Sequence, residues 1–166
     1  MLAEDAVFQT ALECRKGIAM VRFSLNEGEH QRRLANGLGA ETRYARLNLL
    51  SQEPISERRL GIPITPILTT ATAMSWRQGQ GFISRFAGLS PRHIQLSSMP
   101  RDRELAAWEY EWFGIGLSVG DEQLVPAAPL AAERYTVVSW QFAECVYASW
   151  LSKQVRALLP AFSAIQ

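Results

Sequence analysis

The chain is 166 residues long, 48% of its residues are hydrophobic and 20% are charged, and its formal net charge is +1 at pH 7. This composition excludes a disordered protein and predicts one globular domain spanning residues 1–166. No apolar run approaches the roughly 20 residues that a membrane span needs, and the acidic N-terminus does not resemble a secretory signal. We therefore expect a cytoplasmic protein that has no membrane partner.

The residue types that support most enzyme and metal chemistry are scarce. The chain has two cysteines, Cys14 and Cys145, and two histidines, His30 and His93. Two cysteines cannot form a disulfide framework or a four-ligand zinc site, and neither histidine has a metal-binding neighbour at the required spacing. No phosphate-binding, dinucleotide-binding or serine-hydrolase motif occurs. We expect no metal and no cofactor, and we favour a non-enzymatic function over an enzyme.

Charge is distributed unevenly along the chain. Residues 1–14 carry a net charge of −3, residues 15–59 and 60–103 carry +4 each, and residues 104–166 carry −4. The basic side chains are fifteen arginines and only two lysines. Arginine is well suited to bidentate contacts with phosphate or carboxylate groups. Either the basic middle pairs with the acidic end inside the molecule, or it forms a face that meets nucleic acid.

The N-terminal third predicts three helices. Val7, Ala11, Cys14, Ile18 and Val21 recur at steps of three and four residues, which favours a helix from Glu4 to about Val21. A second helix is expected in SLNEGEHQRRLANG, residues 24–37, where Asn26 stands at the N-cap, Glu29 at the capping-box position and Gly37 after the C-terminus. ETRYARLNLL, residues 41–50, predicts a third helix before Pro54.

The middle of the chain predicts strands. PILTTATAMSW, residues 66–76, is rich in side chains that suit a sheet, and RQGQG, residues 77–81, is a turn candidate. In WEYEWF, residues 108–113, tryptophan and tyrosine alternate with Glu109 and Glu111, which favours a half-buried strand, although a helix would also bring Trp108 and Trp112 together. SVGDEQLV, residues 118–125, predicts a tight hairpin at Gly120–Asp121.

The C-terminal region predicts one long helix. Its apolar face runs from about residue 131 to residue 159 and ends at Pro160. This face includes Tyr135, Val138, Phe142, Val146, Trp150 and Val155. Together these elements predict an α+β fold, with N-terminal helices, a central antiparallel sheet and a long C-terminal helix packed on it.

SRFAGLSPRHIQ, residues 84–95, resembles the turn region of AraC-type helix-turn-helix regulators. In that family an A-G-L-S-P-R-H string joins two helices, and Gly88, Ser90 and Pro91 suit the turn and the start of the second helix. The resemblance implies that Arg92, His93 and Gln95 would reach base edges in the major groove. The chain departs from the family after Gln95, where serines and Pro100 follow. This departure favours a strand instead, with Ile94 and Leu96 inward and His93, Gln95 and Ser97 outward.

Our leading functional hypothesis is a non-enzymatic protein that binds another macromolecule, either as a nucleic-acid-associated protein or as an assembly or regulatory subunit. A sequence-specific DNA-binding regulator using residues 82–98 and a small protein-interaction adaptor or chaperone are the alternatives. An enzyme with Glu109 and Glu111 as acid and base is a further class.

Two sets of residues follow from this hypothesis. DNA or RNA would contact the basic set: Arg77, Arg85, Arg92, His93, Gln95, Arg101 and Arg103. A protein partner or a second copy of the chain would contact Trp108 and Trp112, with Glu109 and Glu111 placed to hold a partner's arginine.

Overall fold

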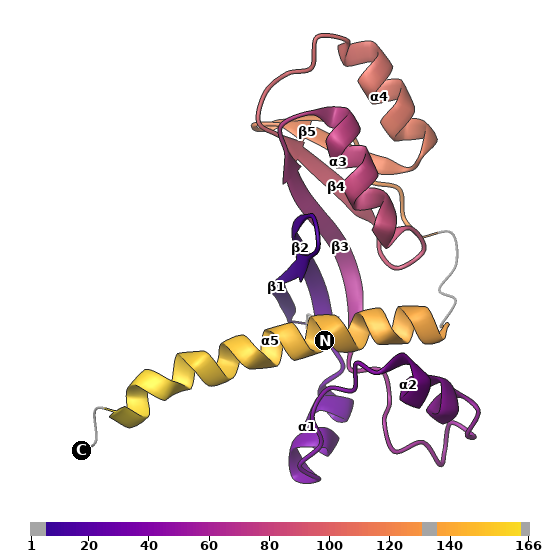
Figure 1. Ribbon diagram of the computed structural model, residues 1–166, viewed down its shortest axis with the longest axis vertical. Helices are drawn as coiled ribbons and strands as arrows, with labels where there is room; N and C mark the ends of the chain where they lie inside the picture. Colours follow the sequence, from indigo (N-terminus) through magenta and orange to yellow (C-terminus); the bar gives the residue numbers. More distant parts are fainter. Residues whose placement is uncertain (1–5, 131–135, 164–166) are drawn as a thin grey trace, which may run out of the picture.

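The computed structural model describes residues 6–130 and 136–163 and, within them, a six-stranded mixed sheet with five α-helices (Figure 1). The strands lie in chain order across the sheet, from β1 to β6. The strand bounds are β1 Val7–Cys14, β2 Gly17–Leu25, β3 Ile64–Ala73, β4 Arg92–Leu96, β5 Ile115–Val119 and β6 Glu122–Val125. The helix bounds are α1 Glu27–Ala35, α2 Tyr44–Ser51, α3 Trp76–Ile83, α4 Arg103–Trp112 and α5 Val137–Ser163, with a short 3₁₀ turn at Ser84–Phe86.

The centre of the sheet is parallel, which corrects the expected antiparallel arrangement. β3, β4 and β5 run in the same direction, and α3 and α4 connect them. Antiparallel hairpins flank this centre, β1–β2 on one side and β5–β6 on the other. The predicted turn at Gly120–Asp121 is confirmed, because Gly120 has a φ of 57° between β5 and β6. Parallel neighbours need a crossover connection, and a helix provides it twice.

The N-terminal segment is a hairpin, so the helix expected from Glu4 to Val21 is wrong over the described residues; residues 1–5 lie outside them. The segment contains apolar residues at both helical and strand spacing. The period of two prevails because Ala19, Val21 and Phe23 are completely buried on one face of β2. Val7 and Ile18, which belonged to the helical stripe, are 52% and 58% exposed.

The second and third predicted helices are confirmed as α1 and α2. Asn26 caps α1 by accepting a hydrogen bond from the Glu29 N–H at 3.2 Å, and Gly37 follows the helix with a φ of 63°. The Glu29 carboxylate does not close a capping box, because its oxygens bind arginines and the Gly61 N–H instead. In α2, Leu47 and Leu50 face inward, as their spacing predicts.

The RQGQG segment is part of α3 and not a turn. Gly79 lies where α3 crosses the sheet, and a Cβ at this position would come within 3.0 Å of Ala73 Cβ and Ile94 Cγ2 and within 3.1 Å of the Tyr110 hydroxyl. A glycine is therefore needed at this position for close packing. Gly81 lies two residues further along the helix and is exposed, and a Cβ at this position would meet no other atom within 4 Å.

WEYEWF is not a strand: its first five residues form the second half of α4, and Phe113 is the C-cap of that helix. Ala106 and Tyr110, four residues apart, are completely buried, and the Tyr110 hydroxyl donates to the Trp76 carbonyl at 2.6 Å. The helical period prevails because it buries this pair against the sheet. Trp108 and Trp112 consequently lie on the opposite, solvent-facing side of α4.

The helix-turn-helix that the AraC-type resemblance implied at residues 82–98 is wrong, and the expected strand with Ile94 and Leu96 inward is confirmed. Arg92–Leu96 form β4 in the middle of the sheet, hydrogen-bonded between β3 and β5, so the second helix of such a motif is replaced by a strand. Ile94 is completely buried and Leu96 nearly so, while His93 and Gln95 lie on the other face. Gly88, with a φ of 74°, does provide the turn that precedes this strand.

The long C-terminal helix packs on the sheet, as expected, and contacts β1 and β3. Phe142, Val146 and Trp150 are buried from its predicted apolar face, whereas Val138 and Val155 are more than half exposed. Tyr135 and the expected start at residue 131 lie outside the described residues. The helix extends to Ser163, so the expected end at Pro160 is wrong. Among the described residues no helix is long and apolar enough to cross a membrane.

Helices α3, α4 and α5 all pack against the same face of the sheet, and their buried side chains form one core with those of the strands. This core includes Ile83 from α3, Tyr110 from α4, Val146 from α5, and Phe23 and Leu117 from the strands. Among the described residues, no helix therefore covers the other face of the sheet, which carries His93 and Gln95.

Two glycine substitutions on α3 test the close approach of this helix to the sheet. Gly79→Ala should lower the free energy of unfolding by about 1–3 kcal/mol, because the added methyl group overpacks the contact. Gly81→Ala should raise it by about 0.4–1 kcal/mol, because only the unfolded chain is restricted. Urea denaturation of both variants measures the two effects, and equal effects of the same sign would contradict this packing.

Candidate functional site

A buried ionic network connects segments that are distant in the sequence: α1, the loops on either side of α2, and α5. The Arg33 side chain is completely buried and donates from Nε to Glu29 Oε1 at 2.7 Å. Its two terminal nitrogens bind the two carboxylate oxygens of Glu144 at 2.9 and 2.6 Å. They also donate to the Gly39 carbonyl at 3.3 Å and the Gly61 carbonyl at 2.7 Å. All five guanidinium N–H groups of Arg33 therefore have acceptors.

The carboxylates of the network reach further. Glu144 accepts from the Glu41 N–H at 2.9 Å and from the Trp140 Nε1–H at 3.1 Å, and Glu29 accepts from the Gly61 N–H at 2.8 Å. Burial alone would raise the pKa of Glu29, but hydrogen bonds from Arg33 and Arg32 lower it below its usual value. The network thus joins α1, the two loops around α2, and α5 into one unit.

The predicted nucleic-acid set does not form one surface. Arg77, Arg101 and Arg103 follow the carboxyl ends of β3 and β4, whereas Arg92 and His93 lie where β4 begins, at the other end of the sheet. Arg103 is paired with Glu122 at 2.6 Å, and Arg92 donates to the Phe113 carbonyl at 2.7 Å. The other members are Arg85, which lies over the Phe82 ring in the 3₁₀ region, and Gln95 on the uncovered sheet face.

Five of the thirteen arginines between residues 15 and 103 form ion pairs with carboxylates among the described residues. These five are Arg32, Arg33, Arg43, Arg46 and Arg103. The basic middle is therefore partly neutralised inside the molecule, and of these five arginines Arg33 and Arg103 pair with the acidic end, residues 104–166.

His93 and Gln95 belong to a hydrogen-bonded chain across β4 and β5. Ser118 Oγ donates to Gln95 Oε1 at 2.5 Å and is therefore free to accept from His93 Nε2–H at 2.7 Å. Gln95 in turn donates to the Gly120 carbonyl at 2.9 Å. The imidazole lies directly on Gly116, where a Cβ would come within 2.3 Å of Nδ1. Burial lowers the pKa of His93, which favours the neutral ring.

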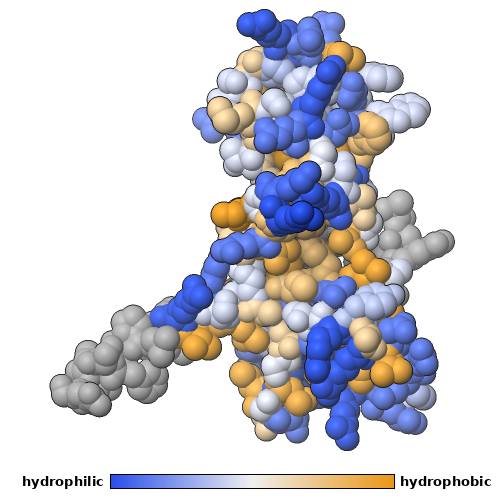
Figure 2. Space-filling model, viewed as in Figure 1, coloured by the Kyte–Doolittle hydropathy of each residue, from blue (hydrophilic) through white to orange (hydrophobic). Residues whose placement is uncertain are grey.

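The predicted partner-binding residues share one exposed helix. Leu105, Trp108 and Trp112 form a stripe on the outer side of α4, with 42%, 60% and 75% of their surfaces exposed. The two indole rings stack on each other, with centroids 6.1 Å apart and an interplanar angle of 28°. We call these three residues the aromatic stripe. Figure 2 shows that the surface at this end of the molecule is mostly hydrophilic, so the stripe is an apolar feature in polar surroundings.

Acidic side chains flank the aromatic stripe on both sides. At about 100° per residue along a helix, Glu104 and Glu111 lie on one side of the stripe and Glu109 lies on the other. Because positions 109 and 111 differ by about 200°, their carboxylates point in different directions and do not form the acid–base pair considered from the sequence. The segment from residue 101 to residue 122 carries six acidic and two basic side chains.

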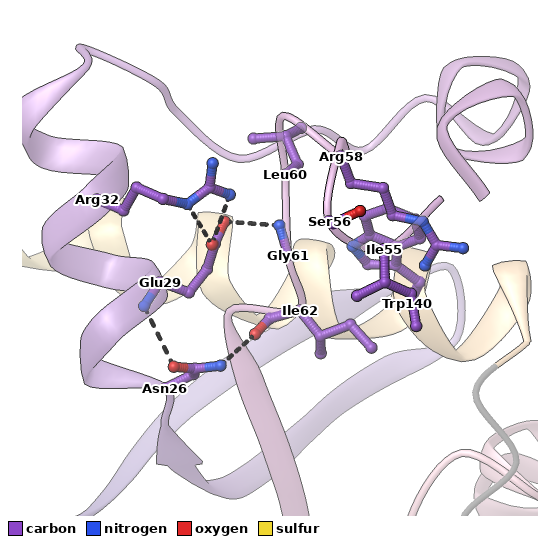
Figure 3. Close-up of a pocket in the computed structure, with 10 residues that line it drawn as sticks. All are labelled: Asn26, Glu29, Arg32, Ile55, Ser56, Arg58, Leu60, Gly61, Ile62 and Trp140. Atoms are coloured by element: carbon purple, nitrogen blue, oxygen red, sulfur yellow. Dashed lines mark hydrogen bonds and ion pairs between the residues drawn. The ribbon is translucent and has the colours of Figure 1, made fainter. Parts of the chain in front are cut away.

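The second candidate site is a groove between α1, α5 and the loop before β3, with a volume of about 600 Å³. In Figure 3, Asn26, Glu29 and Arg32 line one side, and Ile55, Ser56, Arg58 and Trp140 line the other, with Gly61 and Ile62 between them. Sequence analysis missed this groove because its walls come from three distant segments. Asn26 and Glu29, the expected N-cap and capping-box residues of α1, were the parts of it that carried a local signal.

Compared with models of known protein families, with curated proteins and with solved structures, the chain finds no match. Functional inference therefore depends on the two surfaces described above.

The neutral His93 predicts a pH dependence of stability. Because burial lowers the pKa of His93 in the folded state, the unfolded chain takes up the proton first, and stability should fall as the pH falls through about 6.5. His93→Gln should flatten the change in free energy of unfolding between about pH 7.5 and 5.5, as measured by urea denaturation.

Glu41 titrates in a separate pH window. Hydrogen bonding by Arg43 lowers the pKa of Glu41 from 4.5 to about 2, so its contribution is lost only as the pH falls below 4.5. If the free energy of unfolding of His93→Gln changes with pH above pH 5 as steeply as that of the unsubstituted chain, the role given to His93 is contradicted.

Proposed function

We propose that this chain is a non-enzymatic, protein-binding subunit or adaptor, and that its aromatic stripe docks a basic, partly apolar segment of another protein. The observation that carries the proposal is the stacked, exposed pair Trp108 and Trp112 on the outer side of α4. Tryptophans are among the residues most enriched at the energetic centres of protein interfaces.

The aromatic stripe has no evident role in folding. The buried side of α4 is formed by Ala106 and Tyr110, which lie opposite the stripe and anchor the helix to the sheet. Leaving two indole rings and a leucine in water costs free energy that burial against a partner would recover. This division of labour supports a contact role for the stripe.

Charge supports a basic occupant. Glu104, Glu109 and Glu111 border the stripe, and residues 101–122 carry a net charge of −4. Two copies of α4 packed face to face would bring these acids together, so charge disfavours a symmetric dimer through the stripe. An arginine-containing partner would place guanidinium groups both over the indole rings and beside the carboxylates.

The same charge disfavours nucleic acid at the stripe, because phosphates would meet the carboxylates. The basic residues that could attract phosphate are spread over both ends of the sheet, and Arg103 is already paired. These placements favour a protein partner over DNA or RNA, and nucleic acid becomes an alternative outcome of the test.

The test uses three labelled amphipathic peptides of equal length, in which leucine is combined with arginine, lysine or glutamate. We expect the arginine peptide to bind the full chain most tightly in fluorescence anisotropy, and the glutamate peptide not to bind. The Trp108→Ala/Trp112→Ala variant should bind the arginine peptide at least about tenfold more weakly, since interface tryptophans contribute about 2 kcal/mol or more to binding. Added salt should weaken binding by screening the acidic flanks.

Leu49→Ala is the matched control, because Leu49 is a 65% exposed apolar side chain on a different helix, α2. This variant should leave peptide binding unchanged. Equal binding of arginine and glutamate peptides, or full binding by the double tryptophan variant, would overturn the proposal. Salt-sensitive binding of a nonspecific DNA duplex that survives loss of both tryptophans would favour the nucleic-acid alternative instead.

A further inference from the structure

The groove between α1 and α5 lies away from α4, at the other end of the molecule, and the proposed function does not use it (Figure 1). Its volume of about 600 Å³ lies within the range of small-molecule sites. A second hollow of about 310 Å³ borders the same Arg58, Ile62 and Trp140 side chains and extends toward the start of α5. The groove therefore offers room for a small organic molecule.

The apolar wall of the groove has an exposed part and a buried part. Ile55 is 82% exposed, whereas Leu60 and Trp140 are largely buried below it. Figure 3 shows Ile55 and Trp140 on the same side of the groove, next to the Arg58 side chain. A ligand with an apolar body would cover Ile55 and would not have to displace any core packing.

Arg58 supplies the positive charge. Its Nε donates to the Glu53 carbonyl at 2.9 Å and one terminal nitrogen donates to the Ser51 carbonyl at 2.8 Å, while the guanidinium lies 5.8 Å from the centre of the Trp140 ring. Its other terminal nitrogen has no hydrogen-bond acceptor among the described residues. These backbone contacts hold the guanidinium in place and leave donors for a ligand.

The remaining charges in the groove cancel. Arg32 donates twice to Glu29 Oε2, at 2.9 and 2.6 Å, and Glu29 also binds Arg33, which in turn binds Glu144. Two arginines and two glutamates have no net charge, so Arg58 gives the groove a net charge of about +1. The groove therefore fits a ligand with one negative charge.

From these features we infer that the groove between α1 and α5 binds a small organic carboxylate, whose anionic group meets Arg58 and whose apolar body lies against Ile55 and the edge of Trp140. The binding site is independent of the aromatic stripe, so either site can fail its test without affecting the other.

The experiment titrates the ¹⁵N-labelled full chain with 2-naphthoate and follows the tryptophan indole N–H signals by NMR. The Trp140 signal should shift because the Trp140 side chain lines the groove, and the Trp108 and Trp112 signals should stay in place. A probe of this size should bind with a Kd on the order of 1 mM or tighter. The neutral analogue 2-naphthalenemethanol should bind more weakly because it lacks the charge that pairs with Arg58.

Substitutions at Ile55 test the charge without endangering the fold, because this side chain is largely exposed. Relative to Ile55→Gln, Ile55→Glu should lower the affinity for 2-naphthoate about fivefold, and Ile55→Lys should raise this affinity by a similar factor. Arg58→Gln should also weaken it, whereas Arg59→Gln, its sequence neighbour on the rim of a different hollow, should not.

Three results would overturn the inference. The first is equal binding of the acid and the alcohol, and the second is equal affinity of the three Ile55 variants. The third is a titration in which the Trp140 signal stays in place, or in which only the Trp108 and Trp112 signals shift.

Discussion

The completely buried guanidinium of Arg33 sets the constraint on which the lower part of the molecule depends. A charge in a protein interior is tolerated only when it is paired and fully hydrogen-bonded. Arg33 meets that condition by drawing together Glu29 on α1, Glu144 on α5 and the carbonyls of Gly39 and Gly61. Every buried side-chain nitrogen and oxygen in the described residues likewise has a partner. The network therefore specifies one arrangement of these segments.

This arrangement has consequences for both surfaces of the protein. By fixing α1 and the loop before β3 against α5, the network shapes the groove and cancels the charges of Arg32 and Glu29, so that Arg58 alone determines its sign. At the other end, the acids of α4 remain outside the network, and among them Glu104, Glu109 and Glu111 border the aromatic stripe. Part of the positive charge is thus paired within the fold, whereas negative charge is displayed beside exposed tryptophans.

Local signals predicted parts of this structure well. The Asn26 cap, the leucine spacing of α2, the Gly120 turn and the long C-terminal helix were all readable, because each depends on nearby residues. Segments whose apolar spacing fits both a strand and a helix were not predicted correctly. WEYEWF fits either one, and only the burial of Tyr110 against the sheet decides for the helix. Gly79 suggested a turn because the sequence does not reveal which backbone approaches it.

The candidate sites differ in the same way. Trp108 and Trp112 were predicted as contact residues because tryptophans are enriched at interfaces and both lie on one face of either a strand or a helix. The groove could not be predicted, since the pairing of Arg33 with Glu144 spans 111 positions of sequence and nothing near either residue indicates the other. A double-mutant cycle on Arg33→Met and Glu144→Met, measured by urea denaturation, tests this pairing most directly. Each single variant should lose about 3–5 kcal/mol, and the double variant should lose clearly less than the sum. Strictly additive losses, or losses below about 1 kcal/mol, would contradict the central role of this pair.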